Sequence, residues 1–209
     1  TSILAMANAL PYRSWPNATI VQLLGGLGPA DTLEHSAELT QHLAHKLGAK
    51  LRLLPAPGIV ASREMAQALK SDGQISTVLN LAEKADVALV GLGVPKEDSI
   101  VLRTATILTP ADLERLQELG AVGDIALRYM DKEGTPIDLE ITERIIGLTL
   151  EQISKIPRVI GIAGGIAKHK MIRAALHGNI LDVLVTDLST AEALLANVLR
   201  SRGYAVWQN

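Results

Sequence analysis

The feature that most constrains the fold is a regular alternation of short apolar runs with longer amphipathic stretches. The run ATIVQLL at Ala18–Leu24 is rich in apolar and β-branched residues and predicts a strand. In Asp31–Leu47 apolar residues recur three and four positions apart, which predicts an amphipathic helix. Strands that are almost wholly apolar and alternate with helices form a parallel sheet covered on both faces. The sequence therefore predicts an α/β fold with an open, mostly parallel sheet and helices on both faces.

The alternation continues along the rest of the chain. Four more strands are predicted in the apolar runs AKLRLLPAPG, ADVALVGLG, RVIGIAGG and ILDVLVTD. Four more helices are predicted at Ser62–Lys70, Ile75–Lys84, Ala167–Leu176 and Ala191–Arg200. Capping residues mark three helix starts, at Thr109-Pro110, Thr149–Gln152 and Ser189–Glu192. In contrast, Ala121–Glu140 predicts a small antiparallel hairpin that turns near Lys132–Gly134.

Composition excludes several classes of partner and site. The formal net charge of −2 gives the chain no bulk positive field with which to hold nucleic acid. Cysteine is absent, so disulfides and thiolate metal sites are excluded. No apolar run has the length of a membrane span, so we expect a cytoplasmic protein with no membrane contact. Residues 1–209 read as one domain, and the start TSILAMANAL, which lacks methionine, reads as a cut inside a longer protein.

Glycine-bearing turns follow most of the predicted strands. In an open α/β sheet ligands bind beyond the carboxyl ends of the strands, so these turns are expected at one edge. The backbone N–H groups of such turns can approach an anion closely. The glycines concerned are Gly25, Gly26, Gly28, Gly58, Gly93 and Gly165. The alternative is that each glycine only allows the chain to turn.

Two charged residues stand out near this predicted edge. Lys168 follows Gly164-Gly165 at the expected start of a helix, where a cation is unfavourable by about 0.3–1 kcal/mol. A bound phosphate would explain its position, and a solvated lysine is the alternative. Asp124 is a candidate acceptor for sugar hydroxyls, and the alternative is a surface acid on a strand.

We expect neither a metal nor a cofactor. His42 and His45 lie one turn apart, but on the polar face of their predicted helix. The dinucleotide fingerprint fails because Asp31 stands where its third glycine should be. The phosphate-loop pattern of nucleoside triphosphatases also fails, because Ala167 precedes Lys168 and His169 replaces the required Ser or Thr.

The longest of the glycine motifs resembles a known family. The stretch VIGIAGGIAKHKMIRAALHGNILDVLVTDLSTAEALL is similar to the C-terminal signature of the SorC family of bacterial transcriptional regulators. GGLG, LLPAPG, ADVALVGLG and GAVGDIALRYMDKEG match the same family in the same order, and the resemblance covers essentially the whole chain. It implies a sugar-phosphate-binding domain related to the ribose-5-phosphate isomerase and glucosamine-6-phosphate deaminase folds. It also implies a preceding helix-turn-helix that binds operator DNA, and an effector that changes oligomerisation, with a homodimer or homotetramer expected.

The resemblance assigns ligand-binding roles to individual positions. It places Thr1 and Ser2 on a phosphate loop, and it matches Gly25, Gly26 and Gly28 to a phosphate-facing glycine turn. It matches Lys168 to a phosphate-binding lysine, Asp124 to an acid that holds sugar hydroxyls, and His35 and Ser36 to positions that contact the sugar. Leu24 departs from the family, because members that respond to fructose bisphosphate carry arginine there. We therefore expect a monophosphate ligand.

Two further functions are open to this sequence. A sugar-phosphate isomerase or deaminase on the same scaffold needs a carboxylate base and usually a second acid, for which Asp124 and Asp187 are the candidates. The motifs that flank the catalytic carboxylates of those enzymes are not visible, so we expect no enzymatic activity. A purely structural module would not need several glycine turns beside a lysine.

Overall fold

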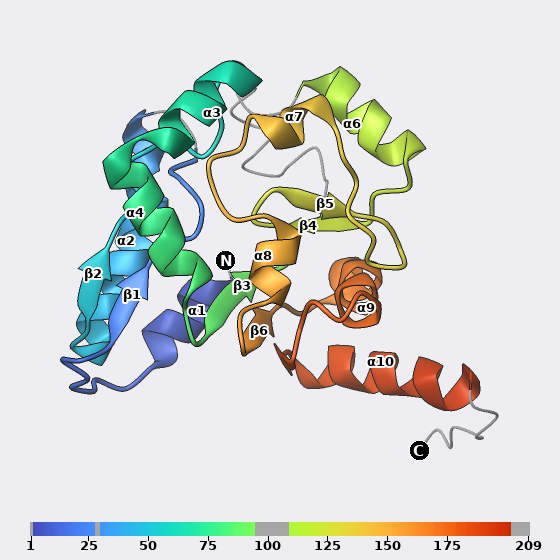
Figure 1. Cartoon of the computed structure of the whole chain (residues 1–209). Helices are drawn as coiled ribbons and strands as arrows, with labels where there is room; N and C mark the ends of the chain where they lie inside the picture. The colour runs from blue at the N-terminus through green and yellow to red at the C-terminus, as the bar shows by residue number, and fades with distance from the viewer. Residues whose placement is uncertain (1, 28–29, 95–108, 202–209) are drawn as a thin grey trace.

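A computed structural model describes the backbone of residues 2–27, 30–94 and 109–201, and the side-chain surroundings of residues 2–27, 37–94 and 109–196 (Figure 1). The strands in these ranges are β1 (Thr19–Val21), β2 (Lys50–Arg52), β3 (Ala88–Gly91), β4 (Gly123–Ile125), β5 (Arg128–Met130), β6 (Val159–Ile162) and β7 (Val183–Val185). The long helices are α1 (Ser2–Ala9), α2 (Ala30–Leu47), α3 (Arg63–Ser71), α4 (Gly73–Glu83), α6 (Pro110–Glu118), α9 (His169–His177) and α10 (Leu188–Ser201). Three short helices complete the set: α7 (Glu140–Glu143), α8 (Leu150–Ser154) and the 3₁₀-helix η1 (Ile166–Lys168).

Parallel strands form the framework of the molecule, which confirms the predicted α/β class. The order of the central sheet is β3-β6-β7, and Ala88 pairs with Val159 while Ile160 pairs with Val183. A second parallel pair joins β1 to β2, with Thr19 opposite Lys50. Because all three strands of the central sheet run the same way, their carboxyl ends meet at one edge.

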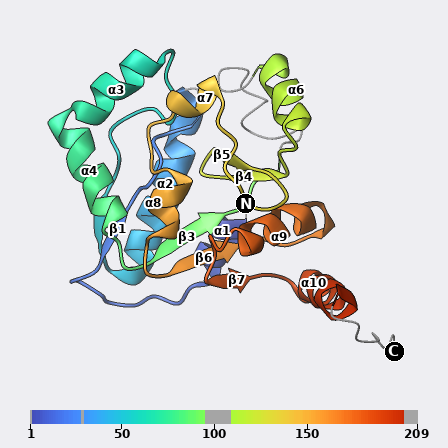
Figure 2. The ribbon, with the colours of Figure 1, turned by 45° about the vertical axis from the view of Figure 1, so that its right-hand side comes forward.

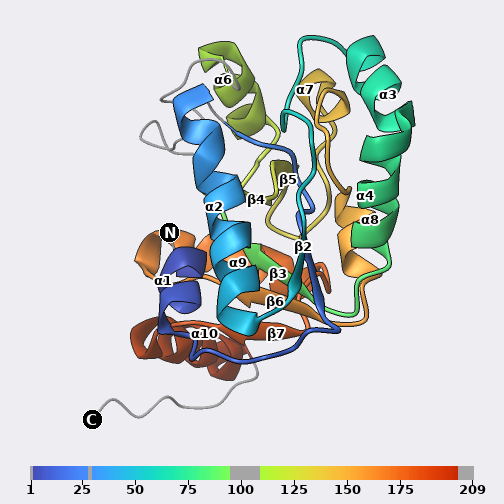
Figure 3. The ribbon, with the colours of Figure 1, turned by 90° about the vertical axis from the view of Figure 1, so that its left-hand side faces the viewer.

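Helices cover the sheets on both faces. The β1–β2 pair lies between α2 and α4 (Figure 3). α1 packs on β3, where Ile3 contacts Gly91. α9 and α10 pack together at the opposite end of the molecule from β1 and β2 (Figure 2). The main core lies around the central sheet, where Val159 of β6, Ile153 of α8 and Ile172 of α9 are fully buried.

Local capping predicted most helix starts. Thr109 opens α6 and Thr149 opens α8, each with a complete capping box, and Ser62 caps α3. The prediction at Ser189–Glu192 was wrong, because α10 already begins at Leu188 and its first turn is capped by Asp187. The Asp187 carboxylate accepts a hydrogen bond from the Thr190 N–H at 2.8 Å, so the helix starts before the predicted capping box.

The antiparallel excursion is present and contains two turns. β4 and β5 pair in antiparallel fashion across a turn at Ala126-Leu127, which the sequence did not predict. The chain then reverses again between Asp131 and Thr135, as predicted, and the Ile137 N–H donates to the Tyr129 carbonyl at 2.9 Å. The segment is therefore a two-stranded antiparallel sheet followed by an isolated bridge between Met130 and Pro136, and the turn at Ala126-Leu127 lies beside Asp124.

Candidate functional site

The carboxyl ends of the central strands carry the residues that we call the candidate edge: Gly93, Asp124, Gly164 to Lys168, Thr186 and Asp187. β6 ends at Ile162, and the Ala163 N–H still donates to the Val185 carbonyl of β7 at 3.1 Å. The chain then turns through Gly164 and Gly165 into η1. Gly165 has a φ of 93°, a conformation that favours glycine. Gly164 has no room for a side chain, because a Cβ there would collide with the Asp187 carboxylate.

Asp187 fixes this glycine turn through its hydrogen bonds. Its carboxylate accepts hydrogen bonds from the Gly165 N–H at 2.8 Å, the Ser189 hydroxyl at 2.6 Å and the Thr190 N–H at 2.8 Å. These donors hold the pKa of Asp187 well below its ordinary range. A carboxylate that is so well hydrogen-bonded is a poor proton acceptor. Asp187 is therefore unsuited to the role of a catalytic acid or base.

The N–H groups of this turn differ in whether they already have an acceptor within the protein. The Gly165 N–H donates to both Asp187 and the Thr190 hydroxyl, the latter at 2.9 Å, so it is occupied. Ile166 and Ala167 open η1, and the first N–H groups of a helix have no acceptor within it. Ile166 is 84% exposed, so the backbone here is accessible to solvent. An anion at this helix start would meet these N–H groups and the side chain of Lys168.

Lys168 and Asp124 act on each other across the candidate edge. Lys168 ends η1, and its side chain is half-buried. Its positive charge is one of the causes that lower the pKa of Asp124. Among the described residues no ion pair involves Lys168. The two residues lie on elements more than forty positions apart in the sequence, and the fold brings them to one place, as the sequence predicted.

Asp124 is a half-buried carboxyl group with an unusual affinity for protons. Burial raises its pKa to about 6, although the Leu127 N–H and the charge of Lys168 act in the opposite direction. Asp124 Oδ2 accepts the Leu127 N–H at 3.0 Å, and this bond spans the turn at Ala126-Leu127. Both turn residues have positive φ, 52° and 64°, which is rare outside glycine. Asp124 therefore stabilises a strained turn as well as facing the candidate edge.

Gly93 accommodates this carboxylate. The Gly93 N–H donates to the Asp124 carbonyl at 2.8 Å, and the Asp124 N–H donates back at 3.2 Å. A Cβ on Gly93 would collide with Asp124 Oδ1. The N–H of Gly93 is thus occupied, and the glycine serves the site by leaving space for Asp124.

The N–H groups of Gly25, Gly26 and Gly58, after β1 and β2, are hydrogen-bonded within the protein. They donate to the carbonyls of Ile146 at 2.9 Å, Ala56 at 3.0 Å and Gly26 at 2.5 Å, respectively. A Cβ on Gly25 would clash with the backbone of Ala56 and Pro57. These glycines let two loops run side by side at close range, with Gly26 bridged in parallel to Pro57, and their ligand-binding role stays a prediction.

Several predicted contact residues lie partly or wholly outside the described residues. Thr1 and Gly28 are not described, and for His35 and Ser36 the structure gives the backbone of α2 but not the side-chain surroundings. Ser2 begins α1 beside the carboxyl end of β3, because the next residue, Ile3, contacts Gly91. Ser2 thus lies near the central edge, whereas the roles of the other four remain predictions.

Two polar groups at the candidate edge were missed. Thr186 Oγ1 directly follows β7 and His169 Nε2 directly follows Lys168, and both atoms are buried without a hydrogen-bond partner among the described residues. Buried polar atoms normally have a partner, so these two atoms are exceptions within the described part of the chain. Their positions immediately after a strand and beside Lys168 were the available sequence signal. Within the described ranges no group of three His, Asp or Glu side chains has a metal-binding arrangement.

The parallel sheet, its glycine turn and the facing Asp124 and Lys168 define the class as an α/β domain built to bind a small molecule at a strand edge. Residues 1–196 match the Sugar-bind family, described as "Putative sugar-binding domain", and the chain belongs to this family. Within the described part of the chain, no helix has both the length and the apolar character needed to cross a membrane.

Similar proteins are transcriptional regulators. The transcriptional regulator LsrR of Klebsiella pneumoniae is 34% identical over 180 residues, which are 85% of this chain and 53% of that protein. The deoxyribonucleoside regulator of Bacillus subtilis is 28% identical over 195 residues, 93% of this chain and 62% of that protein. The chain therefore spans about half the length of the LsrR protein that it matches.

Solved structures share the fold over nearly the whole chain. A DeoR family transcriptional regulator from Listeria monocytogenes gives a TM-score of 0.83 at 31% identity, covering 93% of this chain and 76% of that chain. The full-length sorbitol operon regulator SorC from Klebsiella pneumoniae gives 0.82 at 27% identity, covering 92% of this chain and 63% of that chain. These likenesses confirm the resemblance to the SorC family.

Proposed function

We propose that this domain binds a phosphorylated sugar at the candidate edge and thereby controls a transcriptional regulator of which it is the sensing part. The observation that carries the proposal is that the fold brings Lys168, three residues after Gly165, near enough to Asp124 for its charge to lower the pKa of that carboxyl. One end of this edge offers a cation and helix N–H groups, and the other offers a carboxylate. A ligand with a phosphate and several hydroxyl groups matches both ends.

The phosphate end is formed by η1. The N–H groups of Ile166 and Ala167 open η1 and Lys168 ends it, and such donors are the usual environment of a bound phosphate. This arrangement also explains why the chain accepts a cation at a helix start. The presence of Leu24, where the related bisphosphate-responsive regulators carry arginine, supports a monophosphate.

The sugar end is formed by Asp124. When ionised, its carboxylate accepts hydrogen bonds from hydroxyl groups, and Oδ2 is already shared with the Leu127 N–H. Thr186 Oγ1, which follows β7 at the same edge, is a further candidate contact, because it has no partner among the described residues. A sugar hydroxyl would supply that partner.

The remainder of the proposal concerns the longer protein. The likeness to LsrR and SorC supports a separate DNA-binding part that recognises an operator, with ligand-dependent assembly into a homodimer or homotetramer. Symmetric assemblies are what palindromic operators require.

An enzymatic function is not favoured. Proton transfer between neighbouring carbons needs a base and usually a second acid, and Asp187 is held by its hydrogen bonds in the ionised form. Asp124 alone would have to act as both. Incubation with ribose 5-phosphate or glucosamine 6-phosphate, followed by NMR, should show bound substrate and no product.

Calorimetric titration with sugar monophosphates, bisphosphates and unphosphorylated sugars tests the sensor. We expect Lys168→Met to weaken monophosphate binding about 10- to 100-fold, since it removes a charge-assisted hydrogen bond. The matched control is Lys170→Met, an exposed lysine two positions further along. Equal affinities of wild type and Lys168→Met, or tighter binding of the unphosphorylated sugar, would refute the phosphate assignment.

A further inference from the structure

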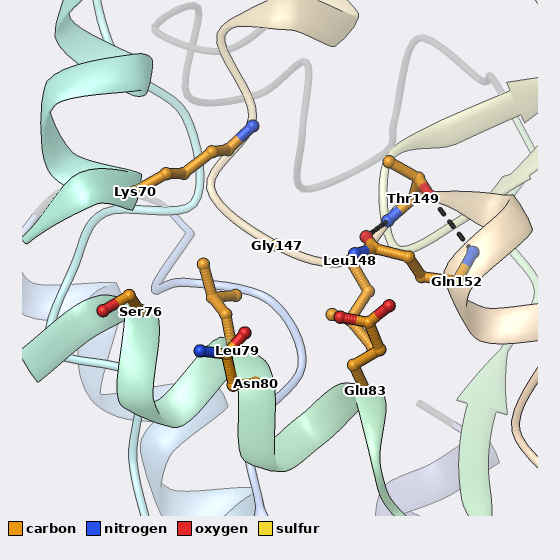
Figure 4. Close-up of a pocket in the computed structure, with 9 residues that line it drawn as sticks. All are labelled: Lys70, Ser76, Leu79, Asn80, Glu83, Gly147, Leu148, Thr149 and Gln152. Carbon is orange, nitrogen blue, oxygen red and sulfur yellow. Dashed lines mark hydrogen bonds between the residues drawn. The ribbon is translucent and has the colours of Figure 1, made fainter. Parts of the chain in front are cut away.

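A second cavity, of about 330 Å³, lies between α4 and the segment that leads into α8. It shares no lining residue with the candidate edge. α4 contributes Ser76, Asn80 and Glu83, the opposite wall is the backbone of Gly147 to Thr149, and Lys70 reaches in from α3 (Figure 4). The volume falls at the lower end of the range for small-molecule sites, about 300–1,000 Å³.

Lys70 is a half-buried cation in this cavity. Burial lowers its pKa, and the positive charge of Arg128 lowers it further. Among the described residues no carboxylate forms an ion pair with Lys70, and no hydrogen bond to its ammonium is found. Lysine is rarely buried without a partner, so a ligand anion would supply the direct counter-charge that Lys70 lacks.

Arg128 places a second positive charge behind the same wall. Its guanidinium is buried and donates to the carbonyls of Thr142 at 2.7 Å, Leu148 at 3.0 Å and Gly147 at 3.4 Å. Asp138 acts on Arg128 through its charge but forms no ion pair with it among the described residues. The Lys70 end of the cavity is therefore positive.

The other end of the cavity carries the carboxylate of Glu83, which also interacts with the charge of Lys155. Glu83 lies across from Lys70, with Leu79 and Asn80 between them (Figure 4). Thr149 and Gln152 are occupied by their capping box, in which the Gln152 N–H donates to Thr149 Oγ1 at 3.1 Å and the Thr149 N–H donates to Gln152 Oε1 at 2.9 Å. The Ser76 hydroxyl donates to the Gly73 carbonyl at 3.3 Å, so the side chains left to bind a ligand are Lys70, Asn80 and Glu83.

We propose that this cavity is a second small-molecule site, for a compound with one anionic group at one end and hydroxyl or ammonium donors at the other. The anionic group binds Lys70, and the donors bind Glu83 and the Asn80 carbonyl oxygen. Glu83 repels a second anionic group, which excludes bisphosphates. Amino acids, hydroxy acids and small phosphate monoesters share this chemistry.

An NMR titration of the ¹⁵N-labelled chain distinguishes these three classes of compound. It also distinguishes binding in the cavity from binding at the candidate edge. The probes are L-serine, L-lactate, glycerol 3-phosphate and inorganic phosphate, each raised to millimolar concentration. We expect at least one organic probe to shift the amides of Gly147 and Leu148 and the side-chain amide of Asn80 saturably, while the amides of Gly93 and Gly165 report the candidate edge separately. If only inorganic phosphate shifts these amides, the proposal of a ligand with an anionic group at one end and donors at the other would be overturned.

Variants test the role of Lys70. Lys70→Met should weaken binding of that probe about tenfold or more, whereas Lys50→Met, at an exposed position on β2, should leave it unchanged. Lys70→Arg keeps the charge and should retain most of the affinity. If the Met variant does not fold, this variant still tests whether the positive charge is what binds the probe. Unmoved Gly147 and Leu148 amides with every probe, or equal binding by Lys70→Met, would overturn the proposal, whatever happens at the candidate edge.

Discussion

Replacement of Asp124 by Asn should stabilise the folded domain at neutral pH while weakening its ligand binding. Burial raises the pKa of Asp124 from its ordinary value of 3.8 to about 6, so the folded state disfavours the ionised form. At about 1.4 kcal/mol for each pKa unit, this rise corresponds to about 3 kcal/mol, and partial exposure reduces it to about 1–3 kcal/mol. Asn can still accept the Leu127 N–H, so the strained turn keeps its hydrogen bond.

The pH dependence of the free energy of unfolding tests whether burial of the Asp124 carboxylate is the cause of this difference. Because the pKa of Asp124 is higher in the folded state, the folded domain binds more protons than the unfolded chain between about pH 4 and pH 6. Its free energy of unfolding therefore falls as pH rises through that window. The Asn variant lacks this loss. Wild type and variant should thus be close in stability near pH 4 and differ most near pH 7.

Urea unfolding followed by far-UV circular dichroism at both pH values measures the difference. Asp86→Asn is the control, since Asp86 is an exposed acid in the turn before β3 and should show no such pH-dependent gain. Calorimetry with the sugar monophosphate should show weaker binding by Asp124→Asn at neutral pH. A variant that is less stable than wild type at both pH values, or a difference that does not change with pH, would refute the burial argument.

Two further substitutions test the framework of the candidate edge. In the same urea assay, Gly93→Ala should lower the free energy of unfolding by about 1–3 kcal/mol, because the new methyl group collides with Asp124 Oδ1. The control is Gly73→Ala, whose methyl group meets open space. This variant should be neutral or stabilising by up to about 1 kcal/mol. Asp187→Asn should lower the melting temperature at neutral pH, because Gly165 and α10 lose a charged acceptor. Since the pKa of Asp187 is depressed in the folded state, this stabilisation is present above the ordinary pKa and is lost as pH falls below it, so melting curves of the two proteins should converge in strong acid. A melting difference that persists there would contradict the assigned role of the charge.

Local signals predicted much of the fold. The capping boxes at Thr109 and Thr149 depend on residues three positions apart, so the sequence contains all their information. The turn at Ala126-Leu127 was missed because neither residue is the glycine or asparagine that such a turn usually requires. Its stabilisation comes from the Asp124 side chain, which a turn rule does not consider.

At the candidate site, too, some features could be predicted from the sequence and others depended on contacts between distant residues. The position of Lys168 followed from the rule that ligands bind beyond the carboxyl ends of parallel strands, whereas that of Asp124, in an antiparallel pair, was implied by the family resemblance. The role of Asp187 could not be predicted, because it depends on the Gly165 N–H, which lies 22 positions earlier in the chain. The packing role of the glycines at positions 25 and 58 could not be predicted for a similar reason, since the close approach of their two loops is a long-range contact.

The guanidinium of Arg128 joins regions that are otherwise separate. Arg128 follows directly on the turn that Asp124 holds, and two of its acceptors, the Gly147 and Leu148 carbonyls, form a wall of the second cavity. The candidate edge and that cavity therefore share one continuous piece of hydrogen-bonded backbone. Thermodynamic linkage then sets a strict condition on any communication through it: a ligand in the cavity that changes the affinity for the sugar phosphate must have its own affinity changed by the same factor.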